Sequence, residues 1–166
     1  MQFLDSQTIV SDNQHKIVFW INTIEQYQEL MGQLHSNFTI QPALFQYLCK
    51  DTHTLLVFTK LLETGALVST AQANLIPDLV TTRAMINNVV THRDCRSCGY
   101  GRITMEYLER RAVELWKVKG QSLRLFLTNS PSKRNSGFYV SLGYRPLTDP
   151  GVLETTGYTV LWCKDM

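Results

Sequence analysis

The residue types best suited to bind an anion are concentrated between Ile86 and Tyr107. This stretch reads as a strand, then a basic loop that ends in Gly-Tyr-Gly, then the start of an amphipathic helix. A helix N-terminus leaves about four backbone N–H groups without partners and carries a partial positive charge. Glycines just before it let an anion approach the backbone. Because Arg93, Arg96 and Arg102 surround the glycines, we expect this stretch to cradle a phosphate group.

Two familiar phosphate-binding motifs do not fit this loop. A dinucleotide-binding loop needs a third glycine where this chain has Thr104, and a phosphate loop needs Gly-Lys-Ser or Gly-Lys-Thr, which the chain lacks. The simplest alternative is a tight turn whose glycines serve packing alone. The local spacing leaves both interpretations open.

The composition predicts one domain with a sizeable core. The chain has 166 residues, 44% of them hydrophobic, and a formal net charge of +2. This weak charge argues against a nucleic-acid partner and favours a small anion. No apolar run approaches the roughly 20 residues of a membrane span, and the N-terminus does not resemble a secretory leader. Four scattered cysteines are too few for a disulfide scaffold, so we expect a reduced, cytoplasmic protein without a membrane partner.

The elements that position the loop alternate between helices and strands, which predicts an α+β domain with a mixed sheet. A hairpin of two strands precedes the strand that leads into the loop. In chain order we expect a strand at 16–21, helices after Asn22 and at Pro42 (the second burying Leu44, Phe45, Leu48 and Cys49), strands at 54–61, 66–76 and 83–91, a long helix that ends at Gly120, a strand at 123–128, a short helix at 135–142 and a strand at 158–163.

The long helix after the glycines has the clearest amphipathic pattern in the chain. At about 100° per residue its apolar side chains fall on one face and its charged side chains on the opposite face. We therefore expect this helix to bury Met105, Leu108, Ala112, Leu115 and Trp116.

A second motif lies further along the chain, where Asn135 opens the run Asn-Ser-Gly-Phe-Tyr-Val-Ser-Leu-Gly-Tyr. Together with Arg96-x-x-Gly99-x-Gly101 it resembles the GCN5-related N-acetyltransferase (GNAT) superfamily, whose signatures are Arg/Gln-x-x-Gly-x-Gly/Ala and Phe/Leu-Tyr-x-x-x-Gly-Phe/Tyr. The resemblance covers roughly residues 20–145. It implies a GNAT fold, with a mixed, mostly antiparallel central sheet flanked by helices on both faces, in a single domain from 1 to 166.

The resemblance also implies an activity. Acetyl-CoA would be the donor, and a primary amine would attack its thioester directly. The hydroxyl of Tyr139 would protonate the departing CoA thiolate; the alternative is that Tyr139 and Phe138 form a buried aromatic pair that anchors a helix. The donor-binding residues that the resemblance implies are the backbone of Val89, Val90 and Thr91 for the pantetheine arm, the loop residues Arg96, Ser97, Cys98, Gly99, Tyr100, Gly101 and Arg102 for the pyrophosphate, and Asn135.

The chain departs from the family pattern where the amine would lose its proton. Many members carry an acidic residue on the strand before the valines, where this chain has Asn87 and Asn88. His92 is the nearest titratable side chain, and Glu63 and Asp78 are weaker candidates. The general base therefore stays open.

Cys95 and Cys98 form a Cys-x-x-Cys pair inside the loop. A zinc site would need two more ligands at suitable spacing, and Cys49 and Cys163 lie far away in the sequence. A thioredoxin-like pair opens a helix after a strand, which fits only loosely. We expect neither a metal nor a redox role, because these are variable positions of the acetyltransferase loop. Alkylation of Cys98 would instead block the binding of CoA.

The acceptor is the part of the reaction that the motifs constrain least. A small-molecule amine is our first expectation, followed by a glucosamine-6-phosphate-type acceptor or a protein amine. Without a carboxylate on the strand, a CoA-binding module that does not catalyse transfer is an alternative of another class. Many relatives are dimers, so a homodimer is also an expectation.

Overall fold

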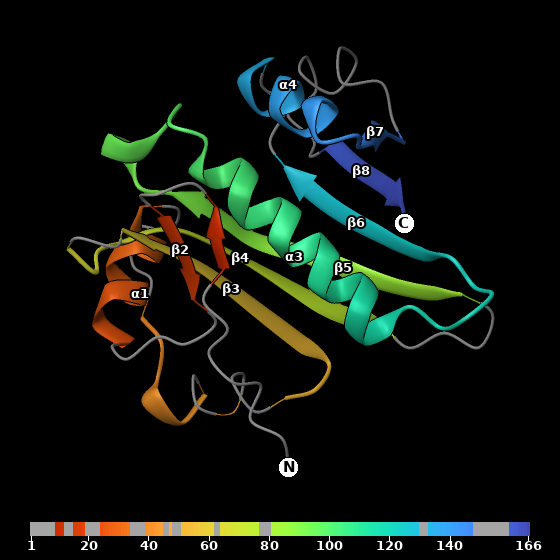
Figure 1. Ribbon diagram of the computed structural model, residues 1–166, viewed down its shortest axis with the longest axis horizontal. Helices are drawn as coiled ribbons and strands as arrows, with labels where there is room; N and C mark the ends of the chain where they lie inside the picture. Colours follow the sequence, from red (N-terminus) through yellow and green to blue (C-terminus); the bar gives the residue numbers. More distant parts are fainter. Residues whose placement is uncertain are drawn as a thin grey trace. The chain divides into compact units, whose positions relative to one another are not determined.

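The computed structural model describes residues 9–11, 15–18, 24–33, 39–44, 47, 51–61, 64–76, 81–129, 133–147 and 160–166. Within these residues an 8-stranded sheet has the order β1-β2-β3-β4-β5-β6-β8-β7 (Figure 1). Its strands are β1 (Ile9–Ser11), β2 (His15–Val18), β3 (Thr54–Leu61), β4 (Leu67–Ile76), β5 (Thr82–Thr91), β6 (Leu123–Asn129), β7 (Arg145–Pro146) and β8 (Val160–Asp165). The helices are α1 (Ile24–Gly32), the 3₁₀ helix η1 (Arg93–Cys95), α3 (Tyr100–Trp116) and α4 (Lys133–Ser141).

The chain divides into two compact units. The first comprises Met1–Gln72 and Asn88–Glu109, and the second comprises Ala73–Asn87 and Arg110–Met166. The elements β4, β5 and α3 each contribute residues to both units. The expectation of a single domain from 1 to 166 stays a prediction.

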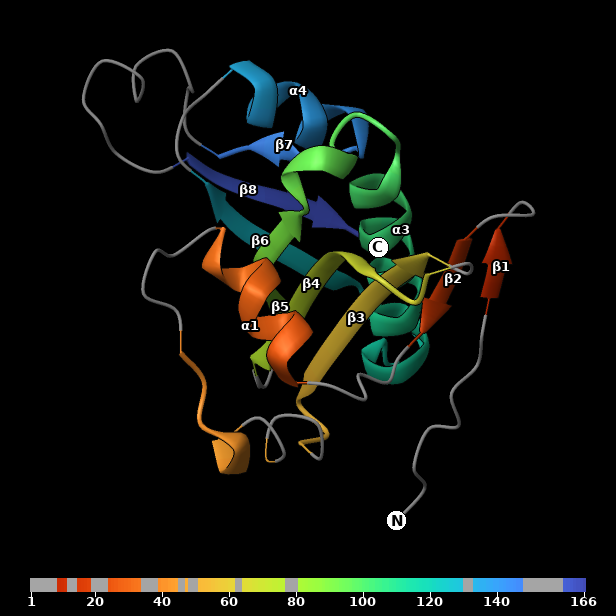
Figure 2. The ribbon, with the colours of Figure 1, turned by 90° about the vertical axis from the view of Figure 1, so that its left-hand side faces the viewer.

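The core of the first unit forms between α1 and the strands of the hairpin. The helix α1 buries Tyr27, Leu30 and Met31, and the ring of Tyr27 meets that of Phe58 edge to face at a centroid distance of 5.7 Å. Figure 2 shows the short strands β1 and β2 beside β3, with which β2 pairs in antiparallel register. Val90, near the end of β5, belongs to the same cluster of buried residues as side chains of β3 and β4. This core therefore fixes the end of β5 beside the hairpin.

The helix predicted at Pro42 is confirmed only in part. Residues 42–44 and 47 are helical, but Leu44 is 51% exposed rather than buried. The described helical residues cover little more than one turn, so the spacing of their apolar side chains does not decide which side faces the core. The other predicted core positions of this helix, Phe45, Leu48 and Cys49, lie outside the described residues.

The helix α3 begins at Tyr100, inside the Gly-Tyr-Gly run rather than after it, and it ends earlier than predicted. It stops at Trp116, and Gly120, with a φ of +82°, lies instead in a turn closed by a hydrogen bond from the N–H of Gln121 to the carbonyl of Val118 (3.0 Å). Leu115 is 43% exposed, because it lies at the margin of the apolar face in the last turn. The other predicted positions, Met105, Leu108, Ala112 and Trp116, are buried.

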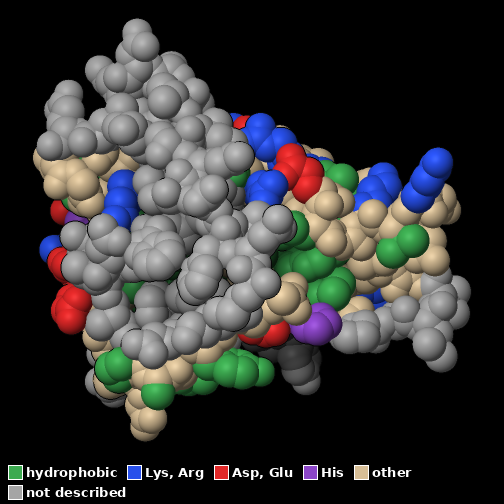
Figure 3. All heavy atoms as spheres, turned by 60° about the horizontal axis from the view of Figure 1, so that its bottom comes forward, with side chains coloured by type: hydrophobic (Ala, Val, Ile, Leu, Met, Phe, Trp, Pro, Cys, Tyr) green, Lys and Arg blue, Asp and Glu red, His purple; other side chains and the backbone are tan. Residues whose placement is uncertain are grey.

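Charged side chains of both signs are exposed across the described surface. On the face drawn in Figure 3, Lys and Arg side chains lie beside Asp and Glu side chains rather than in one continuous patch. This distribution fits the formal net charge of +2. No helix among the described residues is both long enough and apolar enough to cross a membrane.

In the second unit, β5 and β6 form the parallel pair of the sheet. Thr82–Ile86 pairs with Leu123–Leu127 in parallel register, and α3 provides the crossover between the two strands. The pairs β6–β8 and β7–β8 are antiparallel. The predicted mixed, mostly antiparallel sheet is therefore confirmed, although the two short strands β1 and β7 were not predicted.

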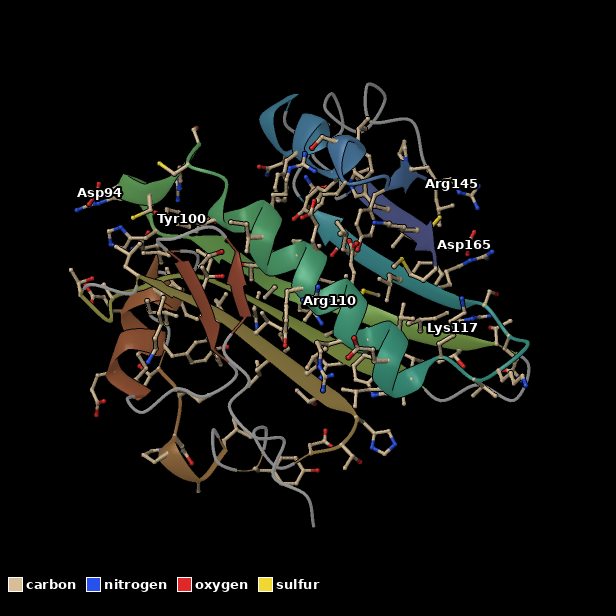
Figure 4. The ribbon with its side chains drawn as sticks, viewed as in Figure 1. Asp94, Tyr100, Arg110, Lys117, Arg145 and Asp165 are labelled. Carbon is tan, nitrogen blue, oxygen red and sulfur yellow. The ribbon has the colours of Figure 1, made fainter. Side chains whose placement is uncertain are left out.

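The end of β8 is held by an ionic cluster. Asp165 accepts hydrogen bonds from the guanidinium groups of Arg124 in β6 and of Arg145 in β7, and Figure 4 shows Arg145 and Asp165 pointing toward one another. The hydrogen bond from Arg124 is the main reason that the pKa of Asp165 lies below its usual value. The C-terminal strand is thus tied to both of its neighbours.

Candidate functional site

The end of β5 directs its backbone groups to two edges in alternation. The N–H of His92 donates to the carbonyl of Val68 in β4 (2.8 Å), and the carbonyl of Val90 accepts a hydrogen bond from the hydroxyl of Ser69 (3.0 Å). Successive residues of a strand direct their backbone groups to opposite edges. Val89 and Thr91 therefore turn theirs away from β4, so these two of the three predicted pantetheine-binding residues are better placed than Val90.

The edge that Val89 and Thr91 face carries no strand partner among the described residues. The ladder between β5 and β6 covers Thr82–Ile86 of β5 and ends there. Backbone groups on a free strand edge can bind an extended ligand as they would bind another strand. The end of β5 therefore offers main-chain hydrogen bonds to a ligand that runs along it.

Asn88 gives β5 an unusual backbone in its middle. Its φ of +53° lies in the left-handed region, which Asn tolerates better than most residues. Its side-chain amide donates to Oε1 of Gln72 (2.9 Å), whereas Asn87 is exposed and donates to Oδ1 of Asn74 (3.4 Å). Sequence reasoning missed this conformation. Two consecutive asparagines inside a strand pattern were the available signal, because Asn is uncommon in strands.

The loop after β5 is anchored at several points. The N–H of Arg93 donates to Oε1 of Gln33, the residue that follows α1 (2.9 Å), and Nδ1 of His92 accepts from the N–H of Asp94 (3.3 Å). The Nε of Arg96 donates to the carbonyl of Thr91 (3.3 Å). These contacts fix the path from the strand to the helix, and they engage the Nδ1 atom of His92, which sequence reasoning considered as a base.

Gly99 lies directly before α3, as the sequence predicts. Gly99 has a φ of +87°, a conformation that a residue with a Cβ rarely adopts. The helix begins at Tyr100, and the N–H of Ile103 donates to the carbonyl of Gly99 (3.1 Å). Thr104 then ties this first turn to β3, because its hydroxyl donates to the carbonyl of Tyr100 and shares a buried hydrogen bond with Thr59 (2.6 Å).

The electrostatics at the start of α3 favour an anion. An α-helix provides no internal carbonyl partners for its first amides, and its N-terminus is partially positive. No acidic residue lies in the first turn. Arg102 is exposed there and forms an ion pair with Glu106 one turn later (3.3 Å). Arg96, Ser97, Cys98 and Gly99 are exposed as well, whereas Tyr100 and Gly101 are half-buried.

Tyr139 is a buried residue of α4. Its ring packs against Phe138, Tyr144 and Trp162, at centroid distances of 5.2, 6.1 and 5.9 Å. Burial raises the pKa of Tyr139 to about 12. Its hydroxyl has no hydrogen-bond partner among the described residues. The helix ends in a cap in which Gly143 has a φ of +87° and the N–H of Tyr144 donates to the carbonyl of Tyr139 (3.0 Å).

The predicted site residues fall into both units. Val89 to Arg102 lie together in the first unit, along the end of β5, the loop and the first turn of α3. Figure 4 shows Asp94 in this loop and Tyr100 at the start of the helix. Tyr139 and the exposed Asn135 belong to α4 in the second unit. Glu63 and Asp78, the weaker candidates for a base, lie outside the described residues.

An open strand edge that leads into a glycine loop and a helix N-terminus is the arrangement that the sequence resemblance implied. The sequence model of the acetyltransferase (GNAT) family matches residues 17–144. The chain belongs to this family. Membership confirms the predicted resemblance and supports acyl transfer as the class of activity. A search of curated proteins gave no match.

Solved structures from several organisms share the fold. An acetyltransferase from Trypanosoma brucei is 19% identical, with a TM-score of 0.66 over 79% of this chain and 92% of that chain. Glucosamine-6-phosphate N-acetyltransferase from Arabidopsis thaliana is 18% identical, with a TM-score of 0.64 over 78% of this chain and 90% of that chain. Arabidopsis thaliana Naa50, in complex with the bisubstrate analogue CoA-Ac-MVNAL, is 10% identical, with a TM-score of 0.65 over 92% of this chain and 99% of that chain.

Proposed function

We propose that the chain transfers the acetyl group of acetyl-CoA to a primary amine on a small molecule. The observation that carries this proposal is the continuity, within the first unit, of the open edge of β5 and the exposed start of α3. The pantetheine arm would bind the backbone of Val89 and Thr91. The pyrophosphate would then meet the amides and arginines of the loop, because a strand edge leads directly to a helix N-terminus.

In the proposed reaction the amine attacks the thioester carbonyl directly, and the CoA thiolate leaves. Tyr139 is proposed to donate a hydrogen bond to that thiolate. A phenol with a pKa of about 12 is a weaker acid than a thiol with an ordinary pKa of about 8.5. The hydroxyl therefore stabilises the departing thiolate as a hydrogen-bond donor and keeps its own proton.

The proposed reaction has no protein carboxylate on β5 to accept the proton of the amine. The amide groups of Asn87 and Asn88 are not bases. The Nδ2 of Asn88 is engaged with Gln72, which leaves its Oδ1 as an acceptor that can orient an amine N–H. The proton itself would pass to water, so the acceptor must reach the thioester as the neutral amine.

The acceptor remains a proposal of class rather than identity. A small-molecule amine is our first choice, and a glucosamine-6-phosphate-type or protein amine is the alternative. Similar folds occur in glucosamine-6-phosphate N-acetyltransferase and in Naa50 bound to a CoA–peptide bisubstrate analogue, which fits either alternative. A CoA-binding module without turnover is the alternative of another class, and Asn87 and Asn88 are the observation that favours it.

Titration calorimetry with acetyl-CoA, followed by a thiol-release assay across a panel of amines, tests the proposal. Arg102→Ala should weaken the binding of acetyl-CoA but not that of acetyl-pantetheine, which lacks the pyrophosphate. Lys117→Ala, which removes an exposed positive charge beyond α3, is the matched control and should change neither. Binding without turnover on any amine would favour the binding module. No measurable binding of acetyl-CoA would contradict both functions.

A further inference from the structure

Cys95 and Cys98 occupy the two ends of a β-turn. Between them, Arg96 has φ −69° and ψ 152°, and Ser97 has φ +65°. These angles belong to a type II turn, in which the third residue takes a positive φ. The Cα atoms at the ends of a β-turn lie within about 7 Å of one another, and a disulfide joins Cα atoms about 4.4–6.8 Å apart. The turn therefore holds the two Cα atoms within the range that a disulfide can span.

The surroundings of the two sulfur atoms support their proximity. Burial raises the pKa of Cys95, and the neighbouring Cys98 and Asp94 raise it further. Tyr100, at the start of α3, has a pKa that is raised by burial and by both cysteines. Two thiols and a phenol thus gather at the point where the loop enters the helix.

The two thiols differ in access. Cys98 is exposed, and its Sγ contacts the carbonyl of Arg96 at 3.6 Å, whereas Cys95 is half-buried. The other free cysteine of the described residues, Cys163, is buried in β8. An oxidant would therefore meet Cys98 first and find Cys95 next to it. In the described part of the chain no three His, Cys, Asp or Glu side chains gather into a metal-binding group.

We propose that Cys95 and Cys98 are a modification site that a hydroperoxide closes into a reversible disulfide, and that the closed form binds acetyl-CoA more weakly. The Cys98 thiolate attacks the peroxide, becomes a sulfenic acid and releases hydroxide or, for an organic peroxide, an alkoxide. The Cys95 sulfur then attacks the sulfenic sulfur, which forms the S–S bond and expels water. In total, two thiols and one hydrogen peroxide yield one disulfide and two waters.

The effect on the donor rests on the proposed function. The backbone of Cys98 and Gly99 is part of the proposed pyrophosphate cradle, directly before α3. A disulfide imposes its own distance and dihedral on the Cys98 side chain and backbone. To bind an anion, the backbone N–H groups of Cys98 and Gly99 must point toward one place, and the geometry of the closed disulfide would turn them away from it. Closure should therefore reduce the affinity for acetyl-CoA by at least about fivefold, the lower end of typical coupling between sites.

Tryptic mapping of the full chain, with Cys49 replaced by Ser, tests the site itself. Trypsin cleaves after Arg93, Arg96 and Arg102, so it separates Asp94–Arg96 from Ser97–Arg102. After mild treatment with hydrogen peroxide, these two peptides should appear as one linked species that dithiothreitol splits. Cys95→Ser and Cys98→Ser should each abolish the linked species, and Cys163→Ser should retain it. Absence of the linked species would overturn the proposal.

Calorimetry with acetyl-CoA on the reduced, oxidised and re-reduced chain tests the consequence. Oxidation should lower the affinity and reduction should restore it. Before peroxide, Cys95→Ser should bind acetyl-CoA as tightly as the reduced natural chain, and Cys163→Ser, which keeps the pair, should follow the natural chain through all three states. Unchanged affinity in a chain with a mapped disulfide would overturn the proposed effect. A reduced chain that does not bind acetyl-CoA would contradict the proposed function instead, while the peptides would still decide the disulfide.

Discussion

Tyr139 combines a structural role with the proposed chemical one. Its ring completes an aromatic cluster with Phe138, Tyr144 and Trp162, and its hydroxyl lacks a partner among the described residues. The two interpretations that the sequence left open are therefore compatible in one side chain. A variant that removes the hydroxyl oxygen of Tyr139 but keeps its ring distinguishes the packing role from the chemical role.

Tyr139→Phe should lower kcat by about 100-fold, because removal of one hydrogen-bond donor aimed at developing charge typically costs about 100-fold or more. The ring contacts remain, so the free energy of unfolding should change little. Tyr144→Phe, in the same cluster, is the control and should retain turnover. Steady-state kinetics with a thiol-release assay measures both. Equal turnover in the two variants would assign Tyr139 to packing alone.

The raised pKa of Tyr139 also predicts how stability depends on pH. Its pKa is about 12 in the folded chain, and an unfolded tyrosine ionises near 10. The contribution of this group to stability is complete below about pH 10 and is lost as the pH rises through about 12. At about pH 11 the loss amounts to about 1.4 kcal/mol. Urea unfolding at about pH 8 and pH 11 should show this decrease in the natural chain and a smaller one in Tyr139→Phe.

Asn88 permits a test of the missing base. Asn88→Asp retains a residue that tolerates the left-handed backbone, and the amide of Gln72 can turn to donate to the new carboxylate. For an acceptor of high pKa, kcat/KM near pH 7 should rise by at least about tenfold, because a positioned base typically contributes more than that. Asn87→Asp is the matched control. A gain in Asn87→Asp alone would place the amine on the other side of β5.

Individual residues of the site were predictable where a motif names them. The motifs name Gly99, the loop arginines and Tyr139, and their binding and catalytic roles stay predictions; the structure confirms only that Gly99 takes a positive φ at the start of the helix. The supports were not found: Gln33, Gln72 and Ser69 hold the loop and the strand from distant parts of the chain. A single sequence carries no periodic signal for such contacts.

At the scale of elements, the loop before α3 requires glycine at position 99, whereas the helix α4 tolerates a side chain at its glycine, Gly137. Gly99→Ala would force a Cβ into a left-handed backbone and should destabilise the chain by about 1–2 kcal/mol. Gly137 lies inside α4 with open space around its Cα, so Gly137→Ala should stabilise by about 0.5–1 kcal/mol. Urea unfolding measures both changes. A shift of the same sign in the two variants would contradict the assigned role of Gly99.

The same Gly99→Ala variant should weaken acetyl-CoA binding, since the loop cannot keep both its turn and its amide directions. Calorimetry on Gly99→Ala and Gly137→Ala at equal temperature separates this effect from global stability. Equal affinities would show that the loop is not the pyrophosphate site.

Elements with strong periodicity were predicted well, and their ends were not. The strands at 54–61 and 66–76 are close to β3 and β4, and the predicted buried face of α3 holds for four of its five positions. The end of α3 was misplaced because Gly120 forms a turn of its own after the helix has stopped. A glycine with positive φ serves a helix cap or a turn equally well, and the sequence alone does not distinguish them.

For the molecule as a whole, the proposed chemistry uses amides, arginines and a hydroxyl, so it requires no metal. Exhaustive treatment with EDTA should leave acetyl transfer unchanged, and added Zn²⁺ should not increase it. A loss that Zn²⁺ restores would contradict the metal-free proposal.

Sedimentation at several concentrations tests the homodimer that we expect from the sequence, which should show a mass near twice 19.1 kDa.

The general architecture followed from the order of the elements. A hairpin and then strand–helix–strand predicts a mixed sheet, and the parallel pairing of β5 with β6 realises it. What could not be predicted is where that pairing stops. The extent of a ladder depends on how far two strands of independent sequence stay in register. Asn87 and Asn88 follow Ile86, the last residue of β5 that pairs with β6, but a pair of asparagines does not by itself specify where a ladder ends.

The alternation at the end of β5 has a consequence for tolerance to mutation. If main-chain groups of Val89 bind the donor, most substitutions at this position change the side chain but leave the groups that contact the donor unchanged. Val89→Thr should keep the affinity for acetyl-CoA, whereas Val89→Pro, which deletes the N–H, should lose it. A saturation library at this codon would then appear permissive to nearly every amino acid and closed to proline, a profile that reveals the backbone as the recognising group.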